Sequence, residues 1–255
     1  QAQEHRGVAA RDRVPAGEPA SDNDGRHEAG KDLAFTGEKN GKGGFKNLKQ
    51  LSMSNSDLNK YANTVAEESS GNKKESFAIA STIKNIANSK NQTIEKTLTK
   101  GIFGYDNGGN DTAYKNNSGN SMGAVINALN GGHDYSNGAT KWDGIDFLAW
   151  GLNSPNGTPH NKFEEYSNIE IEASIYFNYK NAITKDGSSN SIRYGKKSYN
   201  LPAEVFENME NWKIPTSLAL PWCGFQYSTG AKKGGGKTLD ATASYGKTIF
   251  WQVIK

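Results

Sequence analysis

The clearest pattern of apolar and polar residues in the chain is that of an amphipathic helix before residue 71. Apolar side chains recur at spacings of three and four residues and so share one helix face: Leu58, Tyr61, Ala62, Val65 and Ala66. Polar side chains at 54–57 can accept hydrogen bonds from the first N–H groups, and Gly71 can adopt the left-handed conformation that ends a helix. A second helix is expected over the alanine-rich stretch 77–85.

The period of the pattern changes further along the chain. A polar loop is expected over 106–120, followed by a short helix over 122–129. From about residue 167 apolar and polar residues alternate, which is typical of strands. The segments that we expect to be strands are 169–177, 191–194 and 248–254. These patterns predict an α+β fold with a mainly helical core and a β-rich C-terminal part.

Composition divides the chain unevenly. Of its 255 residues, 34% are apolar and 29 are glycine, so we expect a modest core with polar loops. Four of the five arginines lie in the first 30 residues, which contain no lysine and too few apolar side chains to form a core. We therefore expect a disordered or extended N-terminal segment or linker (1–44), a mainly helical core (45–165) and a β-rich part (166–255). This last part belongs to the same domain or is appended to it.

Several function classes find little support. The net charge of +3 is small and the lysines are spread singly, so nucleic-acid binding is not indicated. No apolar run approaches the roughly 18 residues of a membrane span. The single cysteine, Cys223, excludes an intramolecular disulfide, and we interpret it as a buried structural thiol rather than a catalytic one. The stretch 231–238 resembles a phosphate loop in composition, but a strand rather than a helix is expected after it.

The sequence also contains no recognisable metal motif. His133 and His160 are too far apart in the chain to form a local ligand pair, and we expect His160 to be a loop residue. The aspartates of this region do not follow the spacing of a calcium-binding EF-hand loop: Asp106, Asp111, Asp143 and Asp146. We therefore expect no metal and no cofactor.

Two adjacent glutamates close the first predicted helix. At about 100° per residue, Glu67 falls opposite the apolar stripe and Glu68 falls on its flank, so we expect Glu67 to be solvated and Glu68 to be half-buried. Burial and the negative end of the helix dipole both raise the pKa of a carboxyl group. A carboxylic acid that stays protonated near neutral pH is what glycosidic bond cleavage requires as a general acid. The alternative is a glutamate at a helix end that simply faces water.

Two motifs resemble those of the SleB-type cell-wall hydrolases, a family of the lysozyme-like superfamily that includes lytic transglycosylases. The stretch 68–85, with Glu68, Gly71 and Glu75, is similar to the family pattern A-E-x-x-G followed by E-G-x-x-A-V-A-x-V-I-x-N-R. The stretch 133–142 is similar to its second pattern, D-P-T-x-G-A-x-x-F/Y. The chain departs from these patterns in three places: Glu67 replaces the usual Ala, Lys84-Asn85-Ile86 lacks the N-R pair, and Tyr135 replaces Pro. The resemblance covers residues 57–150 and implies that the mainly helical core over 45–165 is a lysozyme-like catalytic core.

This resemblance implies cleavage of the β-1,4 bond between N-acetylmuramic acid and N-acetylglucosamine in peptidoglycan, by a lytic transglycosylase or a muramidase. Glu68 would protonate the leaving oxygen. The residues expected along the substrate path are Glu75, Asp134, Tyr135, Gly138, Ala139 and Trp142. A lytic transglycosylase needs one carboxyl group, whereas a hydrolytic lysozyme more often needs a second. The candidates for that second group are Glu75, Asp106, Asp134 and Asp143.

The expected substrate lies outside the cytoplasm. We therefore expect a secreted, periplasmic or cell-wall protein that is delivered by a route not visible in the sequence. An antibacterial effector is the preferred context, with a secretion or tail-delivery apparatus and an immunity protein as partners. The alternative is a non-catalytic wall-binding or phage-tail-like structural protein that retains the fold. Aromatic residues of the C-terminal part can either complete the core or stack on sugars, and we favour the core.

Overall fold

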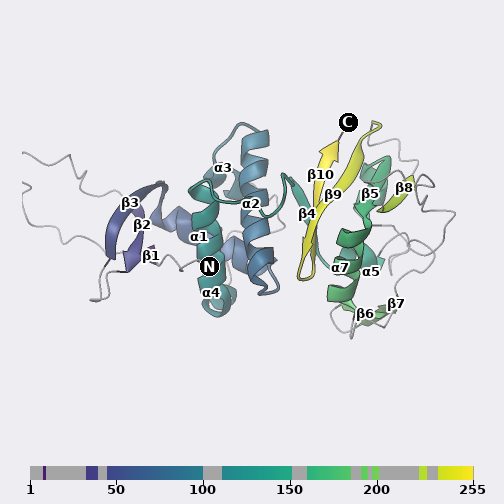
Figure 1. The fold of residues 1–255 in the computed structure, drawn as a ribbon, viewed down its shortest axis with the longest axis horizontal. Coiled ribbons are helices and arrows are strands. Elements are labelled where there is room, and N and C mark those ends of the chain that lie inside the picture. Colours follow the sequence, from purple (N-terminus) through teal and green to yellow (C-terminus); the bar gives the residue numbers. More distant parts are fainter. Residues whose placement is uncertain are drawn as a thin grey trace, which may run out of the picture.

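A computed structural model describes the chain in nine ranges: residues 8–9, 33–39, 45–99, 111–150, 160–184, 191–194, 197–200, 224–228 and 235–254. Within these ranges the chain contains both helices and strands, so the architecture is α+β (Figure 1). Predictions that concern Asp106, Cys223 and nearly all of the first 30 residues lie outside the described residues.

The described structure begins with a three-stranded antiparallel sheet. Its strands, in spatial order, are β1 (Val8–Ala9), β2 (Leu33–Lys39) and β3 (Phe45–Ser54). Ala34 of β2 is buried and belongs to the same hydrophobic cluster as the helices. The expectation that the folded part begins only near Phe45 is therefore wrong, because β2 pairs with β3 and packs on the core.

Four helices follow. They are α1 (Asn55–Glu68), α2 (Lys73–Ser89), α3 (Ile94–Thr99) and α4 (Asp111–Leu129). The expected start of α1 is confirmed, since the Ser54 hydroxyl accepts a hydrogen bond from the Asp57 N–H at 3.0 Å. Gly71 has a φ of +90° in the short turn between α1 and α2, a conformation that favours glycine. The helix α4 begins at Asp111, so the predicted loop over 106–120 is wrong from that residue onward.

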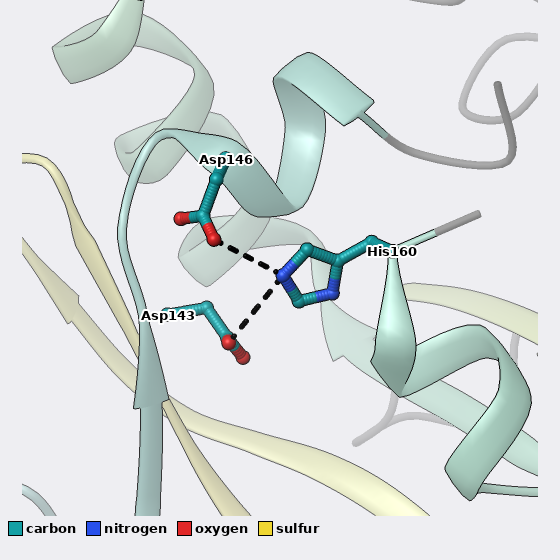
Figure 2. A group of neighbouring side chains, drawn as sticks. All are labelled: Asp143, Asp146 and His160. Carbon is teal, nitrogen blue, oxygen red and sulfur yellow. Dashed lines mark hydrogen bonds and ion pairs between the residues drawn. The ribbon is translucent and has the colours of Figure 1, made fainter. Parts of the chain in front are cut away.

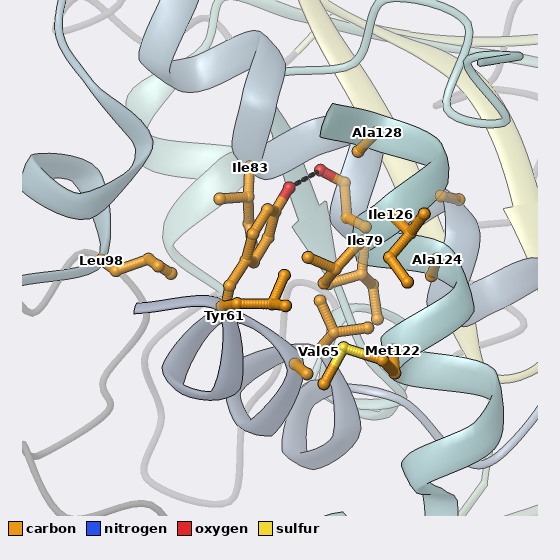
Figure 3. Packing of buried hydrophobic residues seen from close by; sticks show 14 of the residues in the cluster. Tyr61, Val65, Ile79, Ile83, Leu98, Met122, Ala124, Ile126 and Ala128 are labelled. Atoms are coloured by element: carbon orange, nitrogen blue, oxygen red, sulfur yellow. Dashed lines mark hydrogen bonds between the residues drawn. The ribbon is translucent and has the colours of Figure 1, made fainter. Parts of the chain in front are cut away.

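The helical core is built from the facing sides of α1, α2 and α4 (Figure 3). Its centre is formed by side chains that are fully buried, among them Tyr61, Val65, Ile79 and Val125. The Tyr61 hydroxyl donates a hydrogen bond to the Ala80 carbonyl at 2.5 Å. This bond satisfies the one polar group that Tyr61 brings into the core, and it joins α1 to α2.

The C-terminal half is organised around a five-stranded sheet. Its strands, in spatial order, are β4 (Lys141–Asp143), β10 (Thr248–Ile254), β9 (Thr238–Tyr245), β5 (Asn168–Glu172) and β8 (Gly224–Ser228). Neighbouring strands are antiparallel except for β5 and β9. The remaining elements are α5 (Asp146–Trp150), α6 (Asn161–Glu165), α7 (Ala173–Ile183) and the hairpin of β6 (Ser191–Tyr194) with β7 (Lys197–Asn200). A second hydrophobic cluster, which includes Phe147, Tyr179 and Trp251, lies in this half.

Two predictions about this half need correction. The strand expected over 169–177 ends at Glu172, and the chain continues as the helix α7. The boundary expected near residue 165 does not separate the two halves, because β4 precedes it and forms an edge of the C-terminal sheet. The strands expected over 191–194 and 248–254 are confirmed as β6 and β10.

Among the described residues, no helix combines the length and the apolar character that crossing a membrane would require.

Candidate active site

A cavity of about 1170 Å³ lies between the helical core and the C-terminal sheet. The end of α1, the strand β4 and the starts of α5 and α6 contribute to its walls. The ionisable residues that line it include both carboxyl groups and lysines: Glu67, Glu68, Glu75, Asp143, Asp146, Lys90, Lys141, Lys162 and Lys247. It is larger than the roughly 300–1,000 Å³ of a typical small-molecule pocket, which suits a polymer segment.

Glu68 lies at the wall of this cavity, as the last residue of α1. Its Oε2 atom accepts a hydrogen bond from the Trp142 indole N–H at 3.2 Å. Burial raises the pKa of Glu68, the bond from Trp142 lowers it, and the nearby charges of Glu67 and Asp146 raise it again. The net pKa is above the ordinary value, so a larger fraction of Glu68 is protonated at a given pH than for a solvated glutamate.

Trp142 reaches Glu68 because of strand pairing. It is the central residue of β4, where it lies opposite Phe250 of β10. The first predicted motif and the second one thus meet at this hydrogen bond, which joins the end of α1 to the C-terminal sheet. Trp142 is therefore a residue of the expected substrate path that contacts Glu68, the candidate general acid.

Glu67 does not occupy the solvated position expected for it. Its side chain is half-buried, as is that of Glu68, and both residues line the cavity. The helical periodicity placed Glu67 opposite the apolar stripe of α1, but in the structure this end of the helix forms part of the cavity wall. The surroundings that a helix end meets in the fold are not encoded in the periodicity of one helix.

Asp143, Asp146 and His160 form a cluster in the same region (Figure 2). The His160 Nε2 atom lies 3.2 Å from Asp146 Oδ2 and 3.7 Å from Asp143 Oδ1. Lys162 adds a fourth charged group, with its Nζ atom 3.5 Å from Asp143 Oδ1. His160 is buried and caps the start of α6, since its Nδ1 atom accepts a hydrogen bond from the Lys162 N–H at 3.4 Å.

The two aspartates of the cluster have different environments. Burial raises the pKa of Asp143 to about 6, although Lys162 and His160 oppose this shift. Burial also acts to raise the pKa of Asp146, but His160, a backbone hydrogen bond and the charge of Lys162 together outweigh it, so the net pKa is lowered. The side chain of Asp146 is 29% exposed, whereas that of Asp143 is 8% exposed. Asp146 is thus the more acidic and the more accessible of the two carboxyl groups.

The cluster places three ligand-type atoms within 4.8 Å of one another, which is close enough for a metal ion. The hydrogen-bond pattern does not fit one. Because Nδ1 of His160 accepts a backbone N–H, the proton of a neutral imidazole lies on Nε2, which is the nitrogen that faces the aspartates. A metal ligand needs a lone pair at that position, with the proton on Nδ1. The Lys162 ammonium group beside Asp143 also opposes a second cation.

Glu75, expected on the substrate path, is fully buried. Its Oε2 atom accepts hydrogen bonds from the Ser70 N–H at 2.7 Å and the Ser70 hydroxyl at 2.5 Å. Its Oε1 atom accepts from the Lys247 N–H at 3.2 Å and the Thr248 hydroxyl at 2.6 Å. The carboxylate therefore joins the turn after α1 to the turn between β9 and β10, and its oxygens are occupied by protein donors.

Asp134 has a similar structural position. Its carboxylate accepts hydrogen bonds from the Asn85 amide at 2.9 Å, the Ser136 N–H at 2.8 Å and hydroxyl at 2.6 Å, and the Gly138 N–H at 2.9 Å. Burial raises the pKa of Asp134, but these bonds outweigh it and leave the net pKa lowered. The Asn85 amide also donates to the Ala139 carbonyl at 3.1 Å. Asn85 comes from the first motif, so the structure joins the two motifs through this side chain.

Four of the residues expected along the substrate path do not line the cavity: Asp134, Tyr135, Gly138 and Ala139. Ala139 is fully buried in the helical core. Gly138 has a φ of +83°, and a Cβ atom at this position would meet no heavy atom within 4 Å, so its conformation rather than a close contact favours glycine. Tyr135 packs its ring against Phe77, with ring centroids 5.2 Å apart.

Asp146, His160 and Lys162 are the site residues that sequence reasoning did not select. Asp143 was named only as one of four possible second carboxyl groups. The short spacing from Asp143 to Asp146 was visible in the sequence, but the approach of His160 depends on how α6 packs beside β4. No local pattern encodes that approach.

Comparisons with protein-family models, with curated proteins and with solved structures found no match to this chain.

Proposed function

We propose that this protein cleaves the glycan strands of peptidoglycan, with Glu68 as the general acid. The observation that carries the proposal is the position of Glu68: a half-buried carboxyl group with a raised pKa, at the wall of a large cavity, held by the Trp142 indole N–H. A protonated carboxyl group in such a setting can donate its proton to the leaving oxygen of a glycosidic bond.

The choice of peptidoglycan as substrate rests on the resemblance of both motifs to those of the SleB-type hydrolases. The contacts of Asn85 support this resemblance, because they join the two motifs in space. A lysozyme-like arrangement of the helical core is part of the same proposal.

The test is digestion of purified peptidoglycan, with the released fragments identified by mass spectrometry. Wild type is expected to release disaccharide-peptide fragments, and Glu68→Gln is expected to reduce that rate about 10²–10⁴-fold, as loss of a general acid typically does. Glu165→Gln is the matched control, because it removes the same charge from an exposed position on α6. Thermal melting of each variant shows whether the fold survives.

Glu67→Gln provides a finer comparison. The charge of Glu67 raises the pKa of Glu68, so its removal should lower that pKa and move the alkaline limit of activity to lower pH, with little loss at the optimum. If Glu68→Gln were as active as wild type, Glu68 would not be the acid. If wild type bound sacculi without releasing fragments, the non-catalytic wall-binding alternative would hold.

A further inference from the structure

Two carboxyl groups with opposite properties line the same cavity. Glu68 ends α1 and is held by Trp142, while Asp146 begins α5 and is held by His160. The negative charge of Asp146 raises the pKa of Glu68, so the two groups are close enough to interact.

The surroundings of Asp146 keep it ionised and accessible. The His160 Nε2–H group donates to its Oδ2 atom, at 3.2 Å, and the ring of His160 is itself fixed by burial and by the Lys162 N–H. Asp143 faces the same nitrogen of the imidazole, and its Oδ1 atom lies 3.7 Å from His160 Nε2 and 3.5 Å from Lys162 Nζ. A charged aspartate with a positioned donor on one oxygen resembles the paired arrangement in which one acid stays protonated and its partner stays ionised.

Of the other candidates for a second carboxyl group, Asp106 lies outside the described residues, and the remaining three are less suitable than Asp146. Glu75 and Asp134 each accept four hydrogen bonds from protein donors, and Glu75 is fully buried. Asp143 is nine-tenths buried, and its Oδ2 atom is enclosed without a hydrogen-bond partner among the described residues. A buried oxygen of this kind cannot reach a water molecule in the cavity. Among these groups Asp146 alone combines accessibility with a place in the cavity wall.

We propose that Asp146 is a second catalytic residue, a general base that activates water, and that His160 is the residue that positions it. The proposal rests on the function proposed above and specifies its outcome as hydrolysis. Glu68 gives its proton to the leaving oxygen as the bond between that oxygen and the anomeric carbon breaks. The oxygen of water forms the new bond to the anomeric carbon, and its proton passes to Asp146. Glu68 ends as a carboxylate and Asp146 as a carboxylic acid, and exchange with solvent restores both.

Product identity tests this without any variant. Hydrolysis by wild type yields muramic acid with a free reducing end, whereas attack by the sugar's own 6-hydroxyl yields an anhydro ring that lacks one water. In water labelled with ¹⁸O, the hydrolytic product acquires the label at the reducing end and the anhydro product does not. Reducing ends with the label are expected. Predominantly anhydro products would overturn the role of Asp146 and leave the proposed function standing.

Variants test the residue itself. Asp146→Asn should lower the rate about 10²–10⁴-fold, and Asp146→Ala should regain cleavage in sodium azide with a glycosyl azide as product, because azide needs no base. His160→Ala should move the acidic limb of the pH–rate profile to higher pH, because Asp146 loses the hydrogen bond from His160 that lowers its pKa and retains only a backbone hydrogen bond and the charge of Lys162. A merely structural His160 would change the rate without moving that limb.

The outcomes separate the two proposals. Full activity of Asp146→Asn would overturn the role of Asp146 and leave the proposed function standing. Activity that EDTA abolishes and zinc restores would do the same, because it would make the cluster a metal site. Full activity of Glu68→Gln, or a wild type that releases nothing, would overturn the proposed function and the role of Asp146 together.

Discussion

Glu75→Gln is expected to destabilise the fold by about 2–4 kcal/mol while leaving the shape of the side chain unchanged. The native carboxylate accepts four hydrogen bonds, two from backbone N–H groups and two from hydroxyl groups, and the side chain is fully buried. A glutamine places an NH₂ group where one carboxylate oxygen stood. That group faces one hydroxyl, which can rotate and accept, and one backbone N–H, which cannot.

The magnitude follows from these contacts. A buried donor that loses its partner costs about 1–3 kcal/mol, and the remaining bonds lose the strength that a charged acceptor gives them. Ser70 and Lys247 supply the two backbone donors, so one of these turns is loosened whichever way the amide is oriented. The range of about 2–4 kcal/mol allows for partial relaxation by the hydroxyl groups of Ser70 and Thr248.

The assay is denaturant unfolding followed by tryptophan fluorescence, with the midpoint and slope fitted for each variant. Glu165→Gln serves again as the exposed control and should change the free energy of unfolding by less than about 0.5 kcal/mol. If Glu75 instead contacted the glycan, as the motif resemblance implied, the variant would be stable and inactive. A loss below about 0.5 kcal/mol would refute the structural role derived from the hydrogen bonds.

Two further substitutions test packing and charge. Ala139→Leu should cost about 1–3 kcal/mol of stability, because Ala139 is fully buried in the helical core, and a thermal melt equal to that of wild type would contradict this. Asp143→Asn should change how stability depends on pH. Burial raises the folded-state pKa of Asp143 to about 6, so wild type loses stability relative to the variant as pH rises from about 4 to 7, by at most about 3 kcal/mol. Unfolding curves of both proteins across this range measure the difference, and parallel profiles would show that Asp143 titrates normally.

The sequence predicted the helices around the site better than the site itself. The start of α1 followed from the cap at Ser54, and the place of Glu68 on the flank of the apolar stripe agreed with its half-buried side chain. Both depend on neighbours within a few residues. Tyr176, Tyr179 and Ile183 are spaced three and four residues apart, as expected for one face of α7. The alternation of apolar and polar residues before them was followed too far, so the predicted strand ran beyond Glu172.

What the sequence could not predict depends on contacts between distant segments. Glu67 is half-buried in the wall of a cavity that residues far from it in the sequence complete. Glu75 and Asp134 match motif positions, and only their hydrogen-bond partners show that protein donors occupy them. His160 gave no local indication of a role, since its partners Asp143 and Asp146 lie on other elements.

The strand β4 has a consequence for how the protein can be divided. It holds Trp142 beside Glu68, and it is itself held by β10, a strand from the far end of the described chain. The wall of the cavity is therefore completed only when this distant pairing has formed, a type of contact that forms late and slowly in folding. A fragment ending at residue 165 would carry Glu68, Trp142 and Asp146, yet it would lack the strand that orders them. We therefore expect Glu68 and the C-terminal sheet to fold as one cooperative unit.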